Sequence, residues 1–304
     1  MHKVLITGAD GFTGRYLAAE LQQAGFEVHG LVRALPNPSS QPVASVHQLH
    51  VADLADLPAL TAVVQRVQPS AVAHLAAIAF VAHGDADAMY RTNLVGTRNL
   101  LEALMLSQSP VTAVLLASSA NIYGNAVGGA LAETTAPDPA NDYAVSKLAM
   151  EYAARLYAGR LPLVMVRPFN YTGVGQAESF LIPKIVNHIR RRAPLIELGN
   201  LNVARDFSDV RDVVAVYRRL LQTPAAIGQT FNVCSGQAVT LNEVLSLLRA
   251  LSGHAFEVQV NPAFVRANEV KVLLGDCSKL SACVGLIANT PLTETLRWML
   301  SEPV

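Results

Sequence analysis

Short apolar segments alternate with helical segments through the first 167 residues of this 304-residue chain. Each apolar segment has strand length and is rich in β-branched and aliphatic residues. Strands are expected at 4–7, 26–32, 45–51, 71–76, 111–118 and 161–167, and helices at 12–23, from 56 onward, at 86–106 and at 142–158. Such alternation predicts parallel βαβ units and therefore an α/β fold, a doubly wound parallel sheet covered on both faces.

A glycine-rich turn, TGADGFTG at residues 7–14, joins the first strand to the first helix. Its spacing is related to the Rossmann fingerprint, in which glycines bring the backbone close to a pyrophosphate at a helix N-terminus. Gly8 would allow the tight exit from the strand, and Gly14 would let the helix pack closely. Three glycines in an ordinary βα turn are the alternative, but the position after the first strand favours a dinucleotide site. The expected cofactor contacts here are Gly8, Gly11, Phe12, Thr13 and Gly14.

The end of the second strand bears on the choice of dinucleotide. An acidic residue there would bind the ribose 2′-hydroxyl of NAD, whereas this strand ends in Leu-Val-Arg33. Arg33 could pair with a 2′-phosphate, so NADP(H) is preferred and NAD(H) remains an alternative. A solvated surface arginine is the other interpretation. Asp53, after the third strand, is a candidate for adenine contact or for a helix cap.

The alternation ends near residue 168, where glycine-containing loops begin to separate shorter elements. We expect residues 1–168 to form a Rossmann dinucleotide-binding domain. Residues 169–304 would form mainly a smaller C-terminal α/β substrate-binding region, an assignment that allows the chain to cross back to the sheet.

Tyr143 and Lys147 lie four residues apart on an expected helix, so the phenol and the ammonium share one face. A nearby cation favours the ionised phenol, so Lys147 is expected to lower the pKa of Tyr143 and to reach the nicotinamide ribose. Tyr143 could then donate a proton as hydride reaches a carbonyl carbon. Ser118-Ser119 ends the fifth strand at the edge where ligands bind in open α/β sheets. Alone, a Tyr-x-x-x-Lys pair is more often structural, but its combination with the glycine turn favours catalysis.

Five motifs together resemble the extended short-chain dehydrogenase/reductases, which include epimerases, dehydratases and reductases of sugar nucleotides. They are TGADGFTG, HLAA (residues 74–77), SSANIYG (118–124), YAVSK (143–147) and RPFN (167–170). The resemblance runs from Val4 to about Trp298 and implies that Ser119, rather than Ser118, is the active hydroxyl. It also implies further cofactor contacts from Leu54, Leu75, Ala76, Ala77, Asn93 and Arg167.

Asn121 is the residue that narrows the activity within this resemblance. Family dehydratases need a carboxylate between the active serine and the Tyr-Gly pair, and this segment is Ala-Asn121-Ile. The Cys/His pair of fucose-type synthases is also missing from the corresponding region. Hydride delivery to a 4-keto sugar remains, with a 4-epimerase holding NAD tightly as the alternative. A dehydratase and a non-catalytic dinucleotide-binding protein are less favoured.

The C-terminal half resembles most the GDP-mannose branch of the family. The resemblance implies a GDP-4-keto-6-deoxy-hexose as substrate, with GDP-D-rhamnose or GDP-6-deoxy-talose as product. Arginines can donate two hydrogen bonds to phosphate oxygens, and a glutamate can accept from ribose hydroxyls. The implied substrate contacts are Ser119, Asn121, Asn170, Lys184, Arg205, Asn232, Arg266 and Glu269.

Composition argues against several other classes of partner. Twenty-three basic and 23 acidic residues give a formal net charge of zero, so no nucleic-acid partner is expected. Three cysteines without a C-x-x-C pair favour a reducing, cytoplasmic setting. The N-terminal apolar run is too short for a signal peptide or a membrane span.

Two weaker patterns concern assembly and metals. The helices expected at 86–106 and 142–158 are apolar on more than one face, and family members commonly dimerise through such helices, so a homodimer is expected. His47-x-x-His50 has no clustered cysteine or acid, so no metal site is expected. Arg190-Arg191-Arg192 is interpreted as a solvated helix face.

Overall fold

The computed structural model describes residues 2–35, 45–79, 84–126, 129–265, 269–286 and 288–302. Its centre is a seven-stranded sheet in which every paired strand is parallel, in the order β3-β2-β1-β4-β5-β6-β10. The strands are β1 (Lys3–Thr7), β2 (Glu27–Val32), β3 (Gln48–Val51), β4 (Ala71–His74), β5 (Ala113–Ala117), β6 (Leu163–Pro168) and β10 (Thr230–Val233). The predicted doubly wound α/β fold is confirmed.

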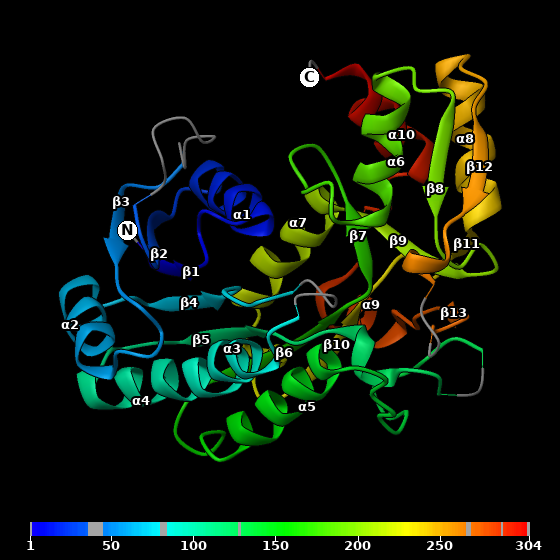
Figure 1. The fold of residues 1–304 in the computed structure, drawn as a ribbon. Helices are drawn as coiled ribbons and strands as arrows, with labels where there is room; N and C mark the ends of the chain where they lie inside the picture. Colours follow the sequence, from blue (N-terminus) through cyan, green and yellow to red (C-terminus); the bar gives the residue numbers. More distant parts are fainter. Residues whose placement is uncertain are drawn as a thin grey trace.

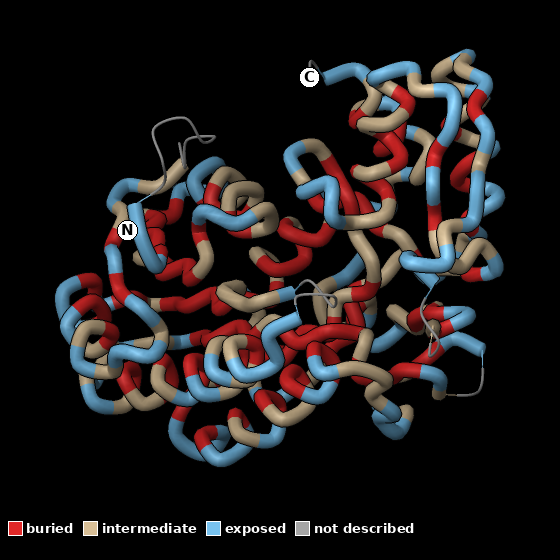
Figure 2. Tube along the Cα trace, viewed as in Figure 1, coloured by how far each residue is buried: buried red, intermediate tan, exposed pale blue. Residues whose placement is uncertain are grey.

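Helices cover both faces of this sheet (Figure 1). One face packs on α1 (Phe12–Gln23), α7 (Val210–Leu221) and α9 (Ser278–Val284). The other packs on α2 (Leu57–Val67), α4 (Thr97–Ser107) and α5 (Asp142–Arg155). Because both faces are covered, the inner strands are mainly apolar, and Figure 2 shows them almost continuously buried.

The helix predicted at 86–106 is interrupted. It consists of α3 (Ala86–Tyr90), a π-helical segment η1 (Arg91–Gly96) and α4. A Cβ at Gly96 would lie 2.8 Å from the Cβ of Leu54, so this part of the helix approaches the loop after β3 too closely for a side chain. The π-helical segment also directs the fully buried Asn93 inward.

Most of the chain after Pro168 forms a second layer of smaller elements. The order β11-β9-β13 describes one sheet, in which β7 also pairs with β9, and β8 pairs with β12 in another. The strands are β7 (Asn170–Thr172), β8 (Leu195–Leu198), β9 (Ala204–Asp209), β11 (Ala238–Thr240), β12 (Glu257–Val260) and β13 (Val272–Leu273). With α6 (Leu181–Arg190), α8 (Leu241–Ser252) and α10 (Leu292–Ser301) they enclose a separate apolar core.

Between these elements the chain returns to the main sheet. After β9 it forms α7, which packs against α1, and then β10, which pairs in parallel with β6. Short 3₁₀ turns complete the described structure, namely η2 (Ala120–Tyr123), η3 (Pro224–Ala226) and η4 (Pro262–Phe264). Within the described residues, no helix combines the length and apolarity needed to cross a bilayer.

Candidate active site

The glycine turn forms a tight cradle between β1 and α1. Gly8 has a φ of +68°, and a Cβ there would lie 2.9 Å from backbone atoms of Ala76. A Cβ on Gly14 would lie 2.1 Å from the carbonyl oxygen of Gly8, so the first turn of α1 packs directly on the glycine turn. Gly11 is the N-cap of α1, and no side chain caps this helix. The N–H groups of its first turn are therefore directed at the space that a diphosphate would need, and the cradle fits a dinucleotide.

The loop after β4 is held over this cradle by a chain of hydrogen bonds. Thr97 Oγ1 donates to the carbonyl of Asn93 (2.7 Å), so it accepts from Nε2 of His74 (2.8 Å). Nδ1 of His74 then accepts from Thr7 Oγ1 (2.7 Å), which itself accepts from the N–H of Ala76 (3.2 Å). His74 is therefore a neutral Nε2–H tautomer. Burial and, to a lesser extent, the charge on Lys147 together lower its pKa to about 3.

Asn93 fixes the same loop from the π-helical segment. Its Oδ1 accepts from the N–H of Ile78 (2.9 Å), while its Nδ2 donates to the carbonyl of Ile78 and to Ser146 Oγ. The predicted cofactor residues Leu75, Ala76 and Ala77 are half-buried on this loop. The amide of Asn93 is thus used in shaping the site.

The residues predicted to contact adenosine follow β2 and β3, the last two strands at one edge of the main sheet. Arg33 follows β2 and is exposed. Asp53 is exposed, and its Oδ1 accepts from the N–H of Ala55 (2.8 Å) in the turn before α2, whose N-cap is Asp56. Leu54 is half-buried beneath Gly96.

Ser119, Tyr143 and Lys147 meet at the carboxyl edge of the sheet. The side chain of Asn141 caps α5 by accepting from the N–H of Ala144, which places Tyr143 in the first turn. All three predicted catalytic side chains are buried, with exposed fractions of 4%, 8% and 4%. The Tyr143 hydroxyl is hydrogen-bonded to Ser119, and Lys147 Nζ donates to the carbonyl of Ala117 (2.7 Å).

The pKa of Tyr143 contradicts one prediction. Burial raises it to about 12, although the hydrogen bond from Ser119 lowers it. Burial also lowers the pKa of Lys147 to about 8, against the opposing effect of Glu151. The sequence predicted that Lys147 would lower the pKa of Tyr143, but the groups that act on this phenol are Ser119 and Tyr171, and desolvation is the largest effect. Tyr143 is therefore protonated at neutral pH.

Asn121 orients the serine hydroxyl. Its backbone N–H and its Nδ2 both donate to Ser119 Oγ, each over 3.1 Å. Because Ser119 Oγ accepts both bonds, its own hydrogen is directed to another acceptor, in agreement with the lowering of the Tyr143 pKa. No carboxylate occupies the position of Asn121.

The GDP-mannose 4,6 dehydratase family profile matches residues 5–299. The chain belongs to this family. A GDP-6-deoxy-D-talose 4-dehydrogenase of Aggregatibacter actinomycetemcomitans is 34% identical over 99% of this chain and 96% of its own length. A GDP-6-deoxy-D-mannose reductase of Pseudomonas aeruginosa is also 34% identical, with the same coverage. The family resemblance inferred from the five motifs is confirmed.

Solved structures of relatives share the whole fold. A protein of Burkholderia cenocepacia, provisionally described as an epimerase, is 53% identical with a TM-score of 0.92, covering 98% of this chain and 97% of that one. RMD from Pseudomonas aeruginosa, complexed with NADPH, is 31% identical with a TM-score of 0.83, covering 99% and 98%.

Two predicted contacts of this family member lie instead in a buried structural network. The guanidinium of Arg167 donates to both carboxylate oxygens of Glu151 (2.9 and 2.7 Å), to Tyr123 Oη and to the carbonyl of Glu133. Asn232 accepts from Tyr123 Oη and donates Nδ2–H to a backbone carbonyl (2.7 Å each). In this structure these polar groups join β6, β10, α5 and η2, and their predicted contacts with cofactor and substrate stay predictions.

The remaining predicted substrate residues lie on the second layer. Arg205 of β9 pairs with Glu269 (2.5 Å), and both side chains are less than one-fifth exposed. Lys184 donates to the carbonyl of Glu197 (2.9 Å) and lies 4.0 Å from the centre of the Phe264 ring. Asn170 is half-buried at the start of β7. Arg266 lies outside the described residues.

Asp206 is a structural residue that the sequence analysis missed. Its fully buried carboxylate accepts from the N–H and hydroxyl of Ser235, from the N–H of Gly236 and from the N–H of Gly275. It thereby joins the loop after β10 to the loop after β13, next to Arg205. Asp206 directly follows the predicted substrate residue Arg205, but its hydrogen-bond partners are distant in sequence.

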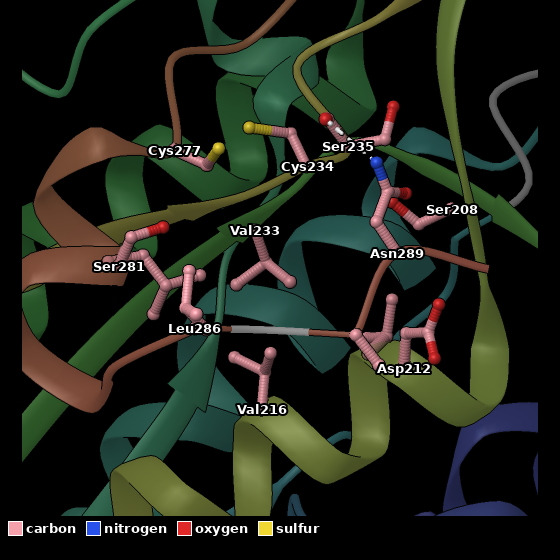
Figure 3. Close-up of a pocket in the computed structure, with 13 residues that line it drawn as sticks. Ser208, Asp212, Val216, Val233, Cys234, Ser235, Cys277, Ser281, Leu286 and Asn289 are labelled. Carbon is pink, nitrogen blue, oxygen red and sulfur yellow. Dashed lines mark hydrogen bonds between the residues drawn. The ribbon is translucent and has the colours of Figure 1, made fainter. Parts of the chain in front are cut away.

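A cavity of about 180 Å³ lies behind this junction, between α7, α9 and the end of β10 (Figure 3). Ser119, Tyr143 and Lys147 are absent from its lining, so it is separate from the catalytic residues.

No cluster of three or more potential metal ligands occurs among the residues described here. The imidazole of His50 is hydrogen-bonded to His29, which binds Glu27, while His47 accepts from a backbone N–H.

Proposed function

We propose that the protein is an oxidoreductase that reduces the 4-keto group of a GDP-4-keto-6-deoxy-hexose. The observation that carries this proposal is the convergence of Ser119, Tyr143 and Lys147 at the same sheet edge as the glycine cradle. Asn121, where a dehydratase would need a carboxylate, favours reduction over dehydration. The names of the talose dehydrogenase and mannose reductase relatives support the substrate class.

The protein would contribute the proton and the electrostatic stabilisation. Tyr143 is protonated at neutral pH, which is the state required of a donor to a carbonyl oxygen. Ser119 can direct its hydroxyl hydrogen at the same oxygen as negative charge develops, because Asn121 occupies its acceptor positions. The ammonium of Lys147, held by the carbonyl of Ala117, would stabilise the phenolate left after proton transfer.

NADP(H) is the proposed cofactor, with NAD(H) as the alternative. When bound, the dinucleotide supplies the hydride. Gly8, Gly11 and Gly14 would hold its diphosphate through the cradle, and Arg33 could pair with a 2′-phosphate. The complex of RMD with NADPH supports this preference. Arg33→Ser should weaken NADPH binding while leaving NADH binding unchanged.

The GDP moiety would bind along the second layer. Arg205 lies in β9 with its guanidinium held by Glu269, and we propose that this pair contacts the nucleotide diphosphate and ribose. Either face of C4 could receive the hydride, giving GDP-D-rhamnose or GDP-6-deoxy-talose. We propose no nucleic-acid or membrane partner.

A nucleotide-sugar 4-epimerase is the second candidate, favoured by the description of the Burkholderia cenocepacia relative. It predicts that the purified protein retains NAD and needs no added reductant. Mass spectrometry of the nucleotides released by denaturation would distinguish the two activities.

The direct test is NADPH oxidation, followed at 340 nm, with GDP-4-keto-6-deoxy-D-mannose as substrate. Tyr143→Phe should lower kcat by about 10² to 10⁴, because the proton donor is lost. Tyr157→Phe is the matched control and should retain the rate. The Tyr157 hydroxyl bonds Glu102, and its ring packs in the apolar core beneath α2, α4 and α5. Conversion of GDP-mannose without the keto sugar, or an unchanged Tyr143→Phe rate, would contradict the proposal.

We also propose a homodimer in the cytoplasm. Large apolar side chains are exposed on η1, α4 and α5, and their burial would favour association. They are Val95, Leu106, Val145, Tyr152 and Leu156. The three cysteines are free, as expected in a reducing compartment. Light scattering should give twice the chain mass, and Leu156→Asp should shift it to the monomer.

A further inference from the structure

The first turn of α1 is hydrogen-bonded to a segment more than 150 residues away. Thr13 Oγ1 lies 2.7 Å from Tyr171 Oη, and the rings of Phe12 and Tyr171 stack with an interplanar angle of 12° and centroids 6.1 Å apart. Thr13 and Phe12 belong to the turn that would bind the cofactor diphosphate. Tyr171 is the central residue of β7, directly after Asn170.

The next turn of α1 adds two more bonds to the same segment. Tyr16 Oη donates to the carbonyl of Val174 (2.7 Å), and Arg15 donates to the carbonyl of Gly175 (3.3 Å). Gly173 lies so close that a Cβ there would be 3.5 Å from the Phe12 ring and 2.6 Å from Val210. Residues 171–175, which we call the strap, are therefore joined to the first two turns of α1 by three hydrogen bonds and a ring stack.

The strap leads directly to the proposed substrate residues. β7 pairs in parallel with β9, with Tyr171 opposite Ser208 and Asn170 opposite Phe207. Arg205 lies in the same strand, two residues before Phe207. A charge on Tyr171 would raise the pKa of Tyr143, so the two phenols are also within electrostatic range.

We propose that Tyr171 is a positioning residue that couples the two halves of the proposed active site: its hydrogen bond to Thr13 aligns β7 with the phosphate-binding turn, so that a bound dinucleotide strengthens binding of the nucleoside diphosphate. This inference rests on the proposed function, since it requires both ligands. Tyr171 itself donates no proton to the substrate. Its contribution is energetic coupling, which must act equally in both directions.

The physical reason lies in how the diphosphate would bind. Phosphate oxygens that accept from the N–H groups of Phe12 and Thr13 fix the first turn of α1. With that turn fixed, the Thr13 hydroxyl holds Tyr171, and the conformational freedom of β7 is already reduced before the second ligand binds. The Tyr171 ring alone would still pack on Phe12, so the hydroxyl is the group to remove.

The experiment measures GDP binding by calorimetry to the full chain, with and without saturating NADPH. In the wild type, NADPH should tighten GDP binding. Tyr171→Phe and Thr13→Val should each reduce this enhancement about fivefold, as expected for one hydrogen bond, and the double variant should lose no more. For Tyr171→Phe, which keeps the ring on Phe12, GDP affinity without NADPH should change little.

Two controls distinguish coupling from general damage. Tyr157→Phe removes a hydroxyl far from the strap and should keep the wild-type enhancement. Thr13→Ser keeps the hydroxyl and should restore coupling that Thr13→Val loses. Binding of both ligands without mutual enhancement, or full enhancement in Tyr171→Phe, overturns the inference while the proposed function stands. Failure of both NADPH and NADH to bind overturns both.

Discussion

His74 should make the stability of this protein fall on mild acidification. Its pKa is lowered from 6.5 to about 3 by burial and by Lys147. The folded state therefore binds fewer protons than the unfolded chain between these values. The contribution of neutral His74 to the free energy of unfolding is therefore fully present well above pH 6.5 and is lost progressively as the pH falls below that value.

The magnitude follows from the width of this interval. For each pH unit in which His74 is protonated only in the unfolded chain, the free energy of unfolding falls by roughly 1.36 kcal/mol. At pH 5 the interval below 6.5 is one and a half units, so His74 alone should cost about 2 kcal/mol of unfolding free energy.

Urea unfolding of the wild type and of His74→Asn at several pH values would measure this. The variant keeps an acceptor for Thr7, but its shorter side chain has no N–H at the position of Nε2 that bonds Thr97, so it should be about 1–3 kcal/mol less stable at pH 7. Between pH 7 and 5 the wild type should lose about 2 kcal/mol more than the variant. Above pH 7.5 the two curves should be parallel, because His74 is neutral in both states. Equal losses in both proteins below pH 6.5 would refute the reasoning.

Three further substitutions test other parts of the structure. Gly14→Ala places a Cβ against the Gly8 carbonyl, so NADPH affinity should fall at least tenfold in a fluorescence titration; retained affinity would show that the turn can open. Glu151→Ala leaves Arg167 buried without its carboxylate and should cost about 3–5 kcal/mol in urea unfolding. Asp206→Ala leaves three backbone N–H groups without their acceptor and should cost at least 2 kcal/mol. A loss below 1 kcal/mol in either of the last two would contradict the assigned network.

Local patterns predicted the main sheet well. The first helix was predicted at 12–23 and α1 has the same bounds, because its apolar spacing and the flanking glycines act within a few residues. The π-helical interruption was not predicted, nor was the close approach of Gly96 to Leu54, which lies more than forty residues away. Periodicity describes one helix and contains no information about such a contact.

The candidate site shows the same limit. Ser119, Tyr143 and Lys147 come together as their positions on one strand and one helix implied. The ion pair between Arg167 and the buried Glu151 was not predicted, because a sequence does not reveal which cation is already paired. The pKa of Tyr143 was mispredicted for a related reason. Spacing indicates a nearby ammonium, but only packing determines how much water the phenol loses.

The position of β10 has a consequence for how the chain can assemble. This strand pairs with β6 but follows β7, α6, β8 and β9 of the second layer in sequence. The parallel sheet is therefore complete only after residue 233 has been synthesised. A nascent chain ending at Pro168 would present the hydrogen-bonding groups of β6 along an open edge. Residues 1–168 alone would therefore lack one strand of the main sheet, and the sheet is completed only by a segment that follows part of the second layer.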